Sequence, residues 1–381
     1  KNFDDSTWKN VNLPHDFSIT QSFTTSGEAE SGFLPGGTGW YRKTFTMPAE
    51  TAGKTVLLNF DGVYSDAYVY VNGTYVAEHH YGYTSFAVDL SDSLVCDGVT
   101  ENVVAVKAVN NIPSSRWYSG SGIYRDVTLL VTDPVHVDLN GITVTTPKVS
   151  SGSGLVQVET DVVNNGTASA NVTVTSTVYK KGSEQALATA STTATVAAGV
   201  TATATASPVV GSYELWSIEN PNLYVVRTEL SVDGQVVDAA ESEFGFRWFA
   251  FTSSGFQLNG KNVKLNGVCM HHDQGALGSA AYYDAMYRQL SIMKDMGVNA
   301  IRSSHNPVDQ DYVAICNELG LLLIEEAFDG VVDPKNGNAN DFSKYFESSV
   351  STGLYGASSG MTCAEFAARS MASRDKNAPS I

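Results

Sequence analysis

Histidine and carboxylate side chains gather in three short segments of the last third of the chain, and each segment follows an apolar run. The segments are Cys269-Met270-His271-His272-Asp273, Arg302-Ser303-Ser304-His305-Asn306-Pro307 and Glu325-Glu326-Ala327-Phe328-Asp329. Such groups can bind a metal ion, hydrogen-bond one another as part of the structure, or form a polar pocket for a hydroxyl-rich ligand. The pocket is the preferred interpretation, because sugars need many short, fixed donors and acceptors.

The sequence around these segments alternates strands with helices, which is typical of a parallel sheet or a (β/α)₈ barrel. Strands are predicted at 263–267, 298–301 and 321–324, and helices at 282–296, 309–319 and 363–373. Barrel enzymes place their active-site groups at the carboxyl ends of the strands. His271, Asp273, His305 and Glu326 are therefore expected on one rim, although only three strand–helix units fit before Ile381.

The first third of the chain alternates short strands with Gly and Asn turns, which predicts a jelly-roll sandwich. Asn72-Gly73, between two strand-like runs, is a strong signal for a two-residue hairpin. Asp133-Pro134 breaks the pattern, so a first domain of residues 1–133 is expected.

A Gly-rich loop of this first domain carries a second group of candidate ligand-binding residues. Asn110-Asn111 ends a predicted strand, and Arg116 and Trp117 come before Gly120-Ser121-Gly122. An indole face can stack on the C–H groups of a sugar, or Trp117 can fill the seam between two domains. Under either interpretation the loop is expected to contact another domain.

A second all-β stretch covers residues 134–245 and predicts an immunoglobulin-like sandwich of about seven strands. Its segment Ala186–Ala206 is almost entirely Ala, Thr, Val and Ser, and the alternation predicts a pair of small-residue strands. No residue in this domain suggests chemistry, so a spacer role is expected. Residues 246–381 then form the start of the barrel domain.

The composition excludes several classes of protein. The 40 acidic residues outnumber the 23 basic ones, for a net charge of −17, whereas a nucleic-acid binder needs a basic surface. No uncharged apolar run approaches the ~18–20 residues that cross a bilayer. The four cysteines contain no CxxC pair, so neither a zinc site nor a disulfide framework is predicted. No signal peptide opens the chain, and cytoplasmic, secreted and cell-surface locations all stay open.

Six segments together resemble glycoside hydrolase family 2, and most closely its bacterial β-galactosidases. They are Leu13–Ser18, Ser115–Val127, Phe244–Arg247, Leu258–Gly278, Asn299–Pro307 and Ile324–Asp329, in the order of the family. The resemblance implies a sugar-binding-like jelly roll, an immunoglobulin-like sandwich and a (β/α)₈ TIM barrel. It implies release of terminal β-galactose from oligosaccharides such as lactose. A β-glucuronidase of the same family and a non-catalytic carbohydrate-binding or assembly fragment are the alternatives.

The resemblance also implies roles for individual residues. His271 and His305 take the places of two histidines that line the glycone subsite of the family. Asp273 follows in the same segment, and Glu326 matches a carboxylate at the third strand end. Asn111 lies near the point where the first domain reaches the glycone in related galactosidases. The expected substrate-binding set is Asn111, Arg116, Trp117, His271, Asp273, His305 and Glu326.

The family mechanism uses two glutamates about 5–5.5 Å apart, one as acid/base and one as nucleophile. The acid/base follows a segment that resembles Arg374–Ile381, and the nucleophile comes later still. No catalytic residue is therefore expected within residues 1–381, which alone are expected to be an inactive fragment. Relatives that bind magnesium carry Glu-Thr-His where this chain has Phe328-Asp329-Gly330, so no metal and no cofactor is expected.

The expected partner is a carbohydrate, namely a β-galactoside. A barrel of three units has open strand edges, which invite pairing with another chain. A homo-oligomer or a complementing C-terminal fragment is therefore the expected protein partner, and neither a nucleic acid nor a membrane is expected.

Overall fold

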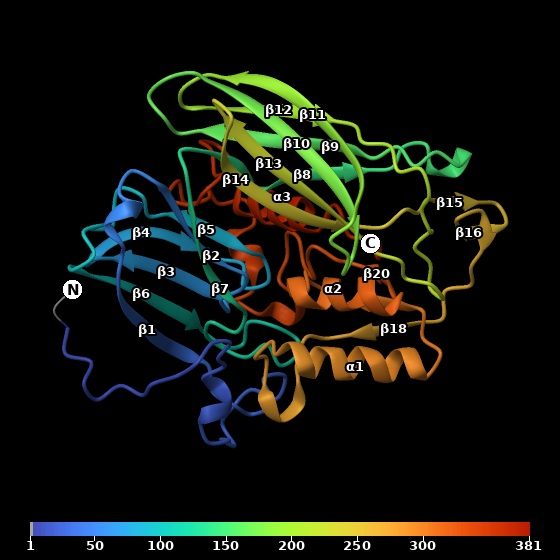
Figure 1. Ribbon diagram of the computed structural model, residues 1–381. Helices are drawn as coiled ribbons and strands as arrows, with labels where there is room; N and C mark the ends of the chain where they lie inside the picture. Colours follow the sequence, from blue (N-terminus) through green and yellow to red (C-terminus); the bar gives the residue numbers. More distant parts are fainter. Residues whose placement is uncertain (1–2) are drawn as a thin grey trace.

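The computed structural model describes residues 3–381, which form three packed parts in sequence order (Figure 1). Two antiparallel β-sandwiches come first, and a parallel sheet with helices ends the chain. The predicted fold class is confirmed.

The first sandwich consists of two sheets that enclose one apolar core. One sheet has the order β1-β6-β3-β4 and the other the order β5-β2-β7. The strands are β1 (Gly37–Thr46), β2 (Thr55–Phe60), β3 (Asp66–Val71), β4 (Thr74–His79), β5 (Phe86–Asp89), β6 (Glu101–Asn110) and β7 (Val127–Thr132). Asn72 and Gly73 join β3 to β4 at φ values of 52° and 91°, so the predicted hairpin is confirmed.

The second sandwich has sheets of order β11-β10-β13-β14 and β12-β9-β8. Its strands are β8 (Val135–Thr145), β9 (Gln157–Asn164), β10 (Ala170–Lys180), β11 (Ala186–Val196), β12 (Val200–Ala206), β13 (Tyr224–Val232) and β14 (Gln235–Phe244). The predicted small-residue strands are present as β11 and β12, but the prediction that they pair with each other is wrong. They pair with β10 and β9 in opposite sheets. This crossover lets Val196 and Ala204 face the core from both sides.

The last part begins with a small hairpin sheet and continues as a parallel sheet of order β18-β19-β20. Its strands are β15 (Phe249–Thr252), β16 (Gly255–Leu258), β17 (Lys261–Asn262), β18 (Gly267–Met270), β19 (Ala300–Ser303) and β20 (Leu322–Ile324). Its helices are α1 (Tyr283–Asp295), α2 (Gln310–Leu319) and α3 (Cys363–Asp375). Short 3₁₀ turns occur at Ser18–Thr20, Ala49–Thr51, Val149–Ser151, Gly275–Leu277, Lys335–Gly337 and Phe342–Tyr345. Within residues 3–381, no helix is both long and apolar enough to cross a membrane.

The first strand of the parallel sheet lies later in the chain than the sequence predicts. The strand expected at 263–267 is wrong, and β18 occupies 267–270 instead. The Asn299 side chain explains the difference, because its Nδ2 donates to the Lys264 carbonyl (2.9 Å) and its Oδ1 accepts from the Asn266 N–H (2.8 Å). These bonds hold the preceding residues outside the ladder.

A buried cluster of charged side chains fastens the first sandwich to the barrel part. Arg374 of α3 pairs with Asp61 at 3.0 Å and with Asp375 at 2.7 Å. Arg125 of the first sandwich donates to the Pro307 carbonyl at 2.8 Å. All of these charged side chains are buried. Since a buried charge is costly without a partner, the cluster fixes how the two parts meet.

The same cluster shifts the pKa values of its carboxyl groups. Burial alone would raise the pKa of Asp61, but the Arg374 and Arg125 charges outweigh it and hold the pKa at about 2. Burial and the Asp375 carboxylate raise the pKa of Glu325 to about 8. At neutral pH the cluster therefore contains both an ionised and a protonated carboxyl group.

Replacement of Arg374 tests how much the cluster stabilises the fold. Arg374→Ala leaves Asp375 buried without its cation and Asp61 with Arg125 alone, and we expect it to lower the free energy of unfolding by about 3–5 kcal/mol. Urea denaturation measures the change. Arg369→Ala on the same helix removes only an exposed pair with Glu365 and should cost less than about 0.5 kcal/mol. Equal losses in the two variants would contradict the role of the cluster.

The raised pKa of Glu325 predicts a pH dependence. Between its ordinary value of 4.5 and about 8, the folded chain holds a proton that the unfolded chain releases. The free energy of unfolding should therefore fall as the pH rises through this range. Glu325→Gln mimics the protonated acid, so urea midpoints measured from pH 5 to pH 8 should fall less steeply in this variant. Equal slopes would show that Glu325 is ionised in the folded chain.

Candidate active site

Three consecutive strand ends bring two imidazoles and a carboxylate together. His271 follows β18, His305 follows β19 and Glu326 follows β20. The His271 and His305 ring centroids are 5.9 Å apart with the rings nearly perpendicular. His305 Nδ1 lies 3.0 Å from Glu326 Oε2. The structure therefore places three of the predicted site residues in one group, because parallel strands end at the same edge of the sheet.

His305 is oriented by two charged neighbours. Its Nδ1 lies 3.0 Å from Arg302 Nη2 as well as 3.0 Å from Glu326 Oε2. Arg302 Nε also donates to Glu326 Oε1 at 2.7 Å, so the three side chains form one closed set. Whichever partner Nδ1 engages, Nε2 is the ring nitrogen left for a ligand.

Trp117 reaches this group from the first sandwich. Its indole centroid is 4.6 Å from the His271 ring and 5.4 Å from the His305 ring. Burial, with the nearby His305, lowers the pKa of His271, so this imidazole is neutral near pH 7. Trp117 thus lies in the seam between the first sandwich and the barrel part, as the second of the two interpretations above predicts. Stacking on a sugar stays a prediction.

Arg116 holds the Trp117 loop against the barrel part. Its Nε donates to Asp329 Oδ2 at 3.0 Å and its Nη2 donates to Asp329 Oδ1, which makes the pair bidentate. The two side chains are 31% and 13% exposed. A forked guanidinium–carboxylate pair restricts orientation as well as distance. The prediction that this loop contacts another domain is therefore confirmed.

The remaining two predicted residues lie apart from this group. Asn111 is exposed, and its side chain hydrogen-bonds to no residue of the described range. Its neighbour Asn110 is buried instead, and Asn110 Nδ2 donates to the Gly120 carbonyl at 2.9 Å, which shapes the loop. Asp273 is half-buried, and its backbone carbonyl, not its carboxylate, accepts from Gln289 at 3.2 Å. A direct role for Asn111 or Asp273 stays a prediction.

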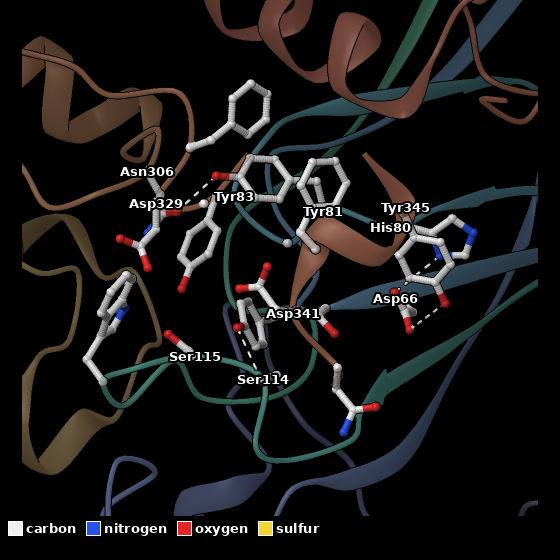
Figure 2. Close-up of a pocket in the computed structure, with 18 residues that line it drawn as sticks. Asp66, His80, Tyr81, Tyr83, Ser114, Ser115, Asn306, Asp329, Asp341 and Tyr345 are labelled. Carbon is white, nitrogen blue, oxygen red and sulfur yellow. Dashed lines mark hydrogen bonds and ion pairs between the residues drawn. The ribbon is translucent and has the colours of Figure 1, made fainter. Parts of the chain in front are cut away.

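A pocket beside the group was missed by the sequence analysis. Figure 2 shows it between the first sandwich and the segment that follows β20, with Asp329 and Asp341 among the side chains around it. It is narrow, with a cavity volume of about 40 Å³. Tyr81 forms part of its wall and donates through its hydroxyl to Asn306 Oδ1 at 2.9 Å. A run of tyrosines (Tyr64, Tyr81, Tyr83) was the available signal, but their convergence depends on tertiary packing.

Three models of one family match successive parts of the chain. The description "Glycosyl hydrolases family 2, sugar binding domain" matches residues 2–134, and "Glycosyl hydrolases family 2" matches residues 135–247. "Glycosyl hydrolases family 2, TIM barrel domain" matches residues 249–381. The chain belongs to glycosyl hydrolases family 2. Within the described residues of this family 2 chain, no three His, Cys, Asp or Glu side chains are grouped so that they could hold a metal ion.

Individual relatives include proteins with two different names. A β-galactosidase of Bacteroides ovatus is 39% identical over 90% of this chain and 40% of that protein. A β-glucuronidase of Bacteroides fragilis is 30% identical over 78% of this chain and 44% of that protein. The crystal structure of a family 2 member from Bacteroides cellulosilyticus has a TM-score of 0.92 and 36% identity, and covers 100% of this chain and 48% of that one. A Bacteroides uniformis β-glucuronidase structure has a TM-score of 0.81 and 31% identity, with 100% and 43% covered. The chain spans less than half the length of each of these relatives.

The Arg116–Asp329 pair predicts how firmly Trp117 is held. Arg116→Ala should increase acrylamide quenching of Trp117 fluorescence, obtained as the difference from the same protein carrying Trp117→Phe. The free energy of unfolding should change by less than about 1 kcal/mol, because the pair is partly exposed. Arg227→Ala, which removes an exposed pair in the second sandwich, is the matched control. Unchanged quenching in Arg116→Ala would show that the loop holds Trp117 without this pair.

Proposed function

We propose that residues 1–381 provide the sugar-binding face of a glycosidase that releases terminal β-galactose from oligosaccharides such as lactose. The observation that carries the proposal is the joint position of His271, His305 and Glu326 beside Trp117 of another domain. The arrangement combines polar groups with a flat aromatic surface, which is what recognition of a hydroxyl-rich ring requires.

The roles of these side chains follow from their contacts. His305 Nε2 and the neutral His271 ring offer hydrogen bonds to sugar hydroxyls, while Glu326 fixes the His305 ring. Glycoside cleavage passes through an oxocarbenium-like state in which the ring flattens and hydroxyl contacts strengthen. Contacts that strengthen in this state accelerate the reaction, whereas contacts equal in both states only improve binding.

The bond-breaking groups are assigned to another part of the family 2 architecture. Retaining glycosidases need an acid/base and a nucleophilic carboxylate on opposite sides of the scissile bond. Glu326 is bound by Arg302 and His305, which fits an orienting role better than attack on carbon. We place both catalytic glutamates in the portion of the relatives that this chain does not span. Purified 1–381 should therefore not hydrolyse an aryl β-galactoside.

The charges at the site favour a neutral glycone over a glucuronide. Arg116 is neutralised by Asp329 and Arg302 by Glu326. Among the described residues of the site, no arginine is left without a carboxylate partner for a uronate carboxylate. This balance supports galactoside as the substrate, in line with the name of the Bacteroides ovatus relative.

A panel of nitrophenyl glycosides, assayed with the complete polypeptide of the gene, tests the proposal. The β-galactoside should give the highest kcat/KM, with the β-glucuronide at least about a hundredfold lower, because an unpaired buried carboxylate is costly. The reverse order would establish the β-glucuronidase alternative. Turnover of no glycoside, with sugar binding retained, would establish a non-catalytic binding module.

His305→Ala in the complete polypeptide should lower kcat by about a hundredfold with a smaller change in KM, because it removes a contact that is strongest in the transition state. His15→Ala is the matched control, since His15 bonds to Tyr41 within the first sandwich. Steady-state kinetics on the best aryl glycoside measure both variants, and melting temperatures confirm that each is folded. An unchanged kcat/KM in His305→Ala would remove His305 from the site.

A further inference from the structure

The outer side of the β1-β6-β3-β4 sheet carries aromatic side chains. Sheets with one face toward solvent usually present polar residues there. Here Trp40 on β1 and Tyr75 on β4 are 45% and 47% exposed, and Tyr70 on β3 is half-buried. The opposite side of the same sheet packs Val69 and Val106 into the core. We call Trp40, Tyr70 and Tyr75 the aromatic face.

Strand register brings these rings into one continuous surface. Tyr70 lies opposite Ala105 of β6, which in turn lies opposite Arg42 of β1. Because Ala105 is small, the Trp40 and Tyr70 rings meet across β6, with centroids 5.6 Å apart and planes 39° apart. Tyr75 follows at 5.6 Å and 67°, so it stands as a wall at the end of a shallow platform.

Charged side chains lie around the aromatic face, and one of them, Lys107, places its ammonium 5.2 Å from the Tyr68 ring centroid. Arg42 pairs with Asp5, and His80 lies 3.2 Å from Asp66 and 3.4 Å from Glu78. The chain as a whole carries a net charge of −17, which repels anionic ligands such as nucleic acids and polyuronates. An anionic partner of this face is therefore disfavoured, and a neutral partner must offer flat apolar patches to the aromatic rings.

We propose that the aromatic face is a second carbohydrate-binding surface, which holds an extended neutral glycan by stacking its sugar rings on Trp40 and Tyr70. Sugar rings offer apolar C–H patches to aromatic faces and hydroxyls to flanking polar groups such as Lys107, which lies in register with Trp40. The matching family model describes residues 2–134 as a sugar binding domain, without assigning a face.

The three rings lie outside the candidate active site, although Asp66 and His80 at the edge of the aromatic face also line the pocket beside that site. In Figure 1 the β1-β6-β3-β4 sheet forms the side of the first sandwich remote from the second sandwich and from α1 and α2. None of the three rings stacks on or hydrogen-bonds to His271, His305 or Glu326. The inference therefore does not rest on the proposed function, and a glycan bound here would hold the protein on a polymer rather than enter the site.

Affinity electrophoresis of the complete polypeptide in gels containing neutral galactan, galactomannan or xyloglucan tests the proposal, with polygalacturonate as the anionic control. At least one neutral polymer should slow migration, and polygalacturonate should not. Trp40→Ala and Tyr75→Ala should each lower the association constant about five- to tenfold, the effect of losing one aromatic contact to the glycan. Phe251→Ala, which removes a ring that is 79% exposed on β15, is the matched control and should leave retardation unchanged.

Three further measurements keep the test decisive. Melting temperatures show whether each variant is folded, and Tyr75→Ala covers the case in which Trp40→Ala is not. Turnover of a small aryl glycoside should be the same in all variants, whether or not the galactoside assignment holds. Absence of retardation by every neutral polymer would overturn the proposal. So would a change in sedimentation coefficient in Trp40→Ala, which would identify the face as a contact between copies of the chain.

Discussion

The pairing of Arg374 with Asp61 inside the molecule is the interaction on which the site depends. Helix α3 follows the long segment after β20, and this pair returns it to the first sandwich. Glu325 joins the same cluster, with one oxygen 3.5 Å from Arg374, while its neighbour Glu326 turns toward His305. Of these two consecutive side chains, Glu325 therefore belongs to the buried cluster and Glu326 to the candidate site. Because they share a backbone, the buried cluster also sets the position of the rim.

The rim itself is built from charges that cancel locally. Arg302 with Glu326 and Arg116 with Asp329 are both ion pairs, and burial keeps His271 neutral. The surface that results is rich in hydrogen-bonding groups but carries little net charge. Such a surface suits hydroxyl groups, because they are recognised by well-oriented hydrogen bonds rather than by a net charge.

Sequence patterns predicted the features that depend on neighbouring residues in the chain. They failed where contacts with residues far away in the sequence determine the structure. Strand–helix alternation placed His271, His305 and Glu326 at neighbouring strand ends, because β/α units order themselves along the chain. The pairing of Ala186–Ala206 was wrong, since alternation shows that strands form but not which sheet each one joins. The start of β18 was misplaced because the Asn299 side chain, more than thirty residues away, holds the preceding segment.

Trp117 and its partners come from different domains, and this has a consequence for how such proteins diverge. Recombination at the junction between the second sandwich and the barrel would separate Arg116 from Asp329 and Trp117 from His271. A barrel taken from a relative would bring its own counterparts of Asp329 and His271, and these would face an Arg116–Trp117 loop from a different protein. The first sandwich and the barrel part are therefore expected to be inherited together, and exchange of whole modules should preserve these contacts only when the 111–122 loop travels with its barrel.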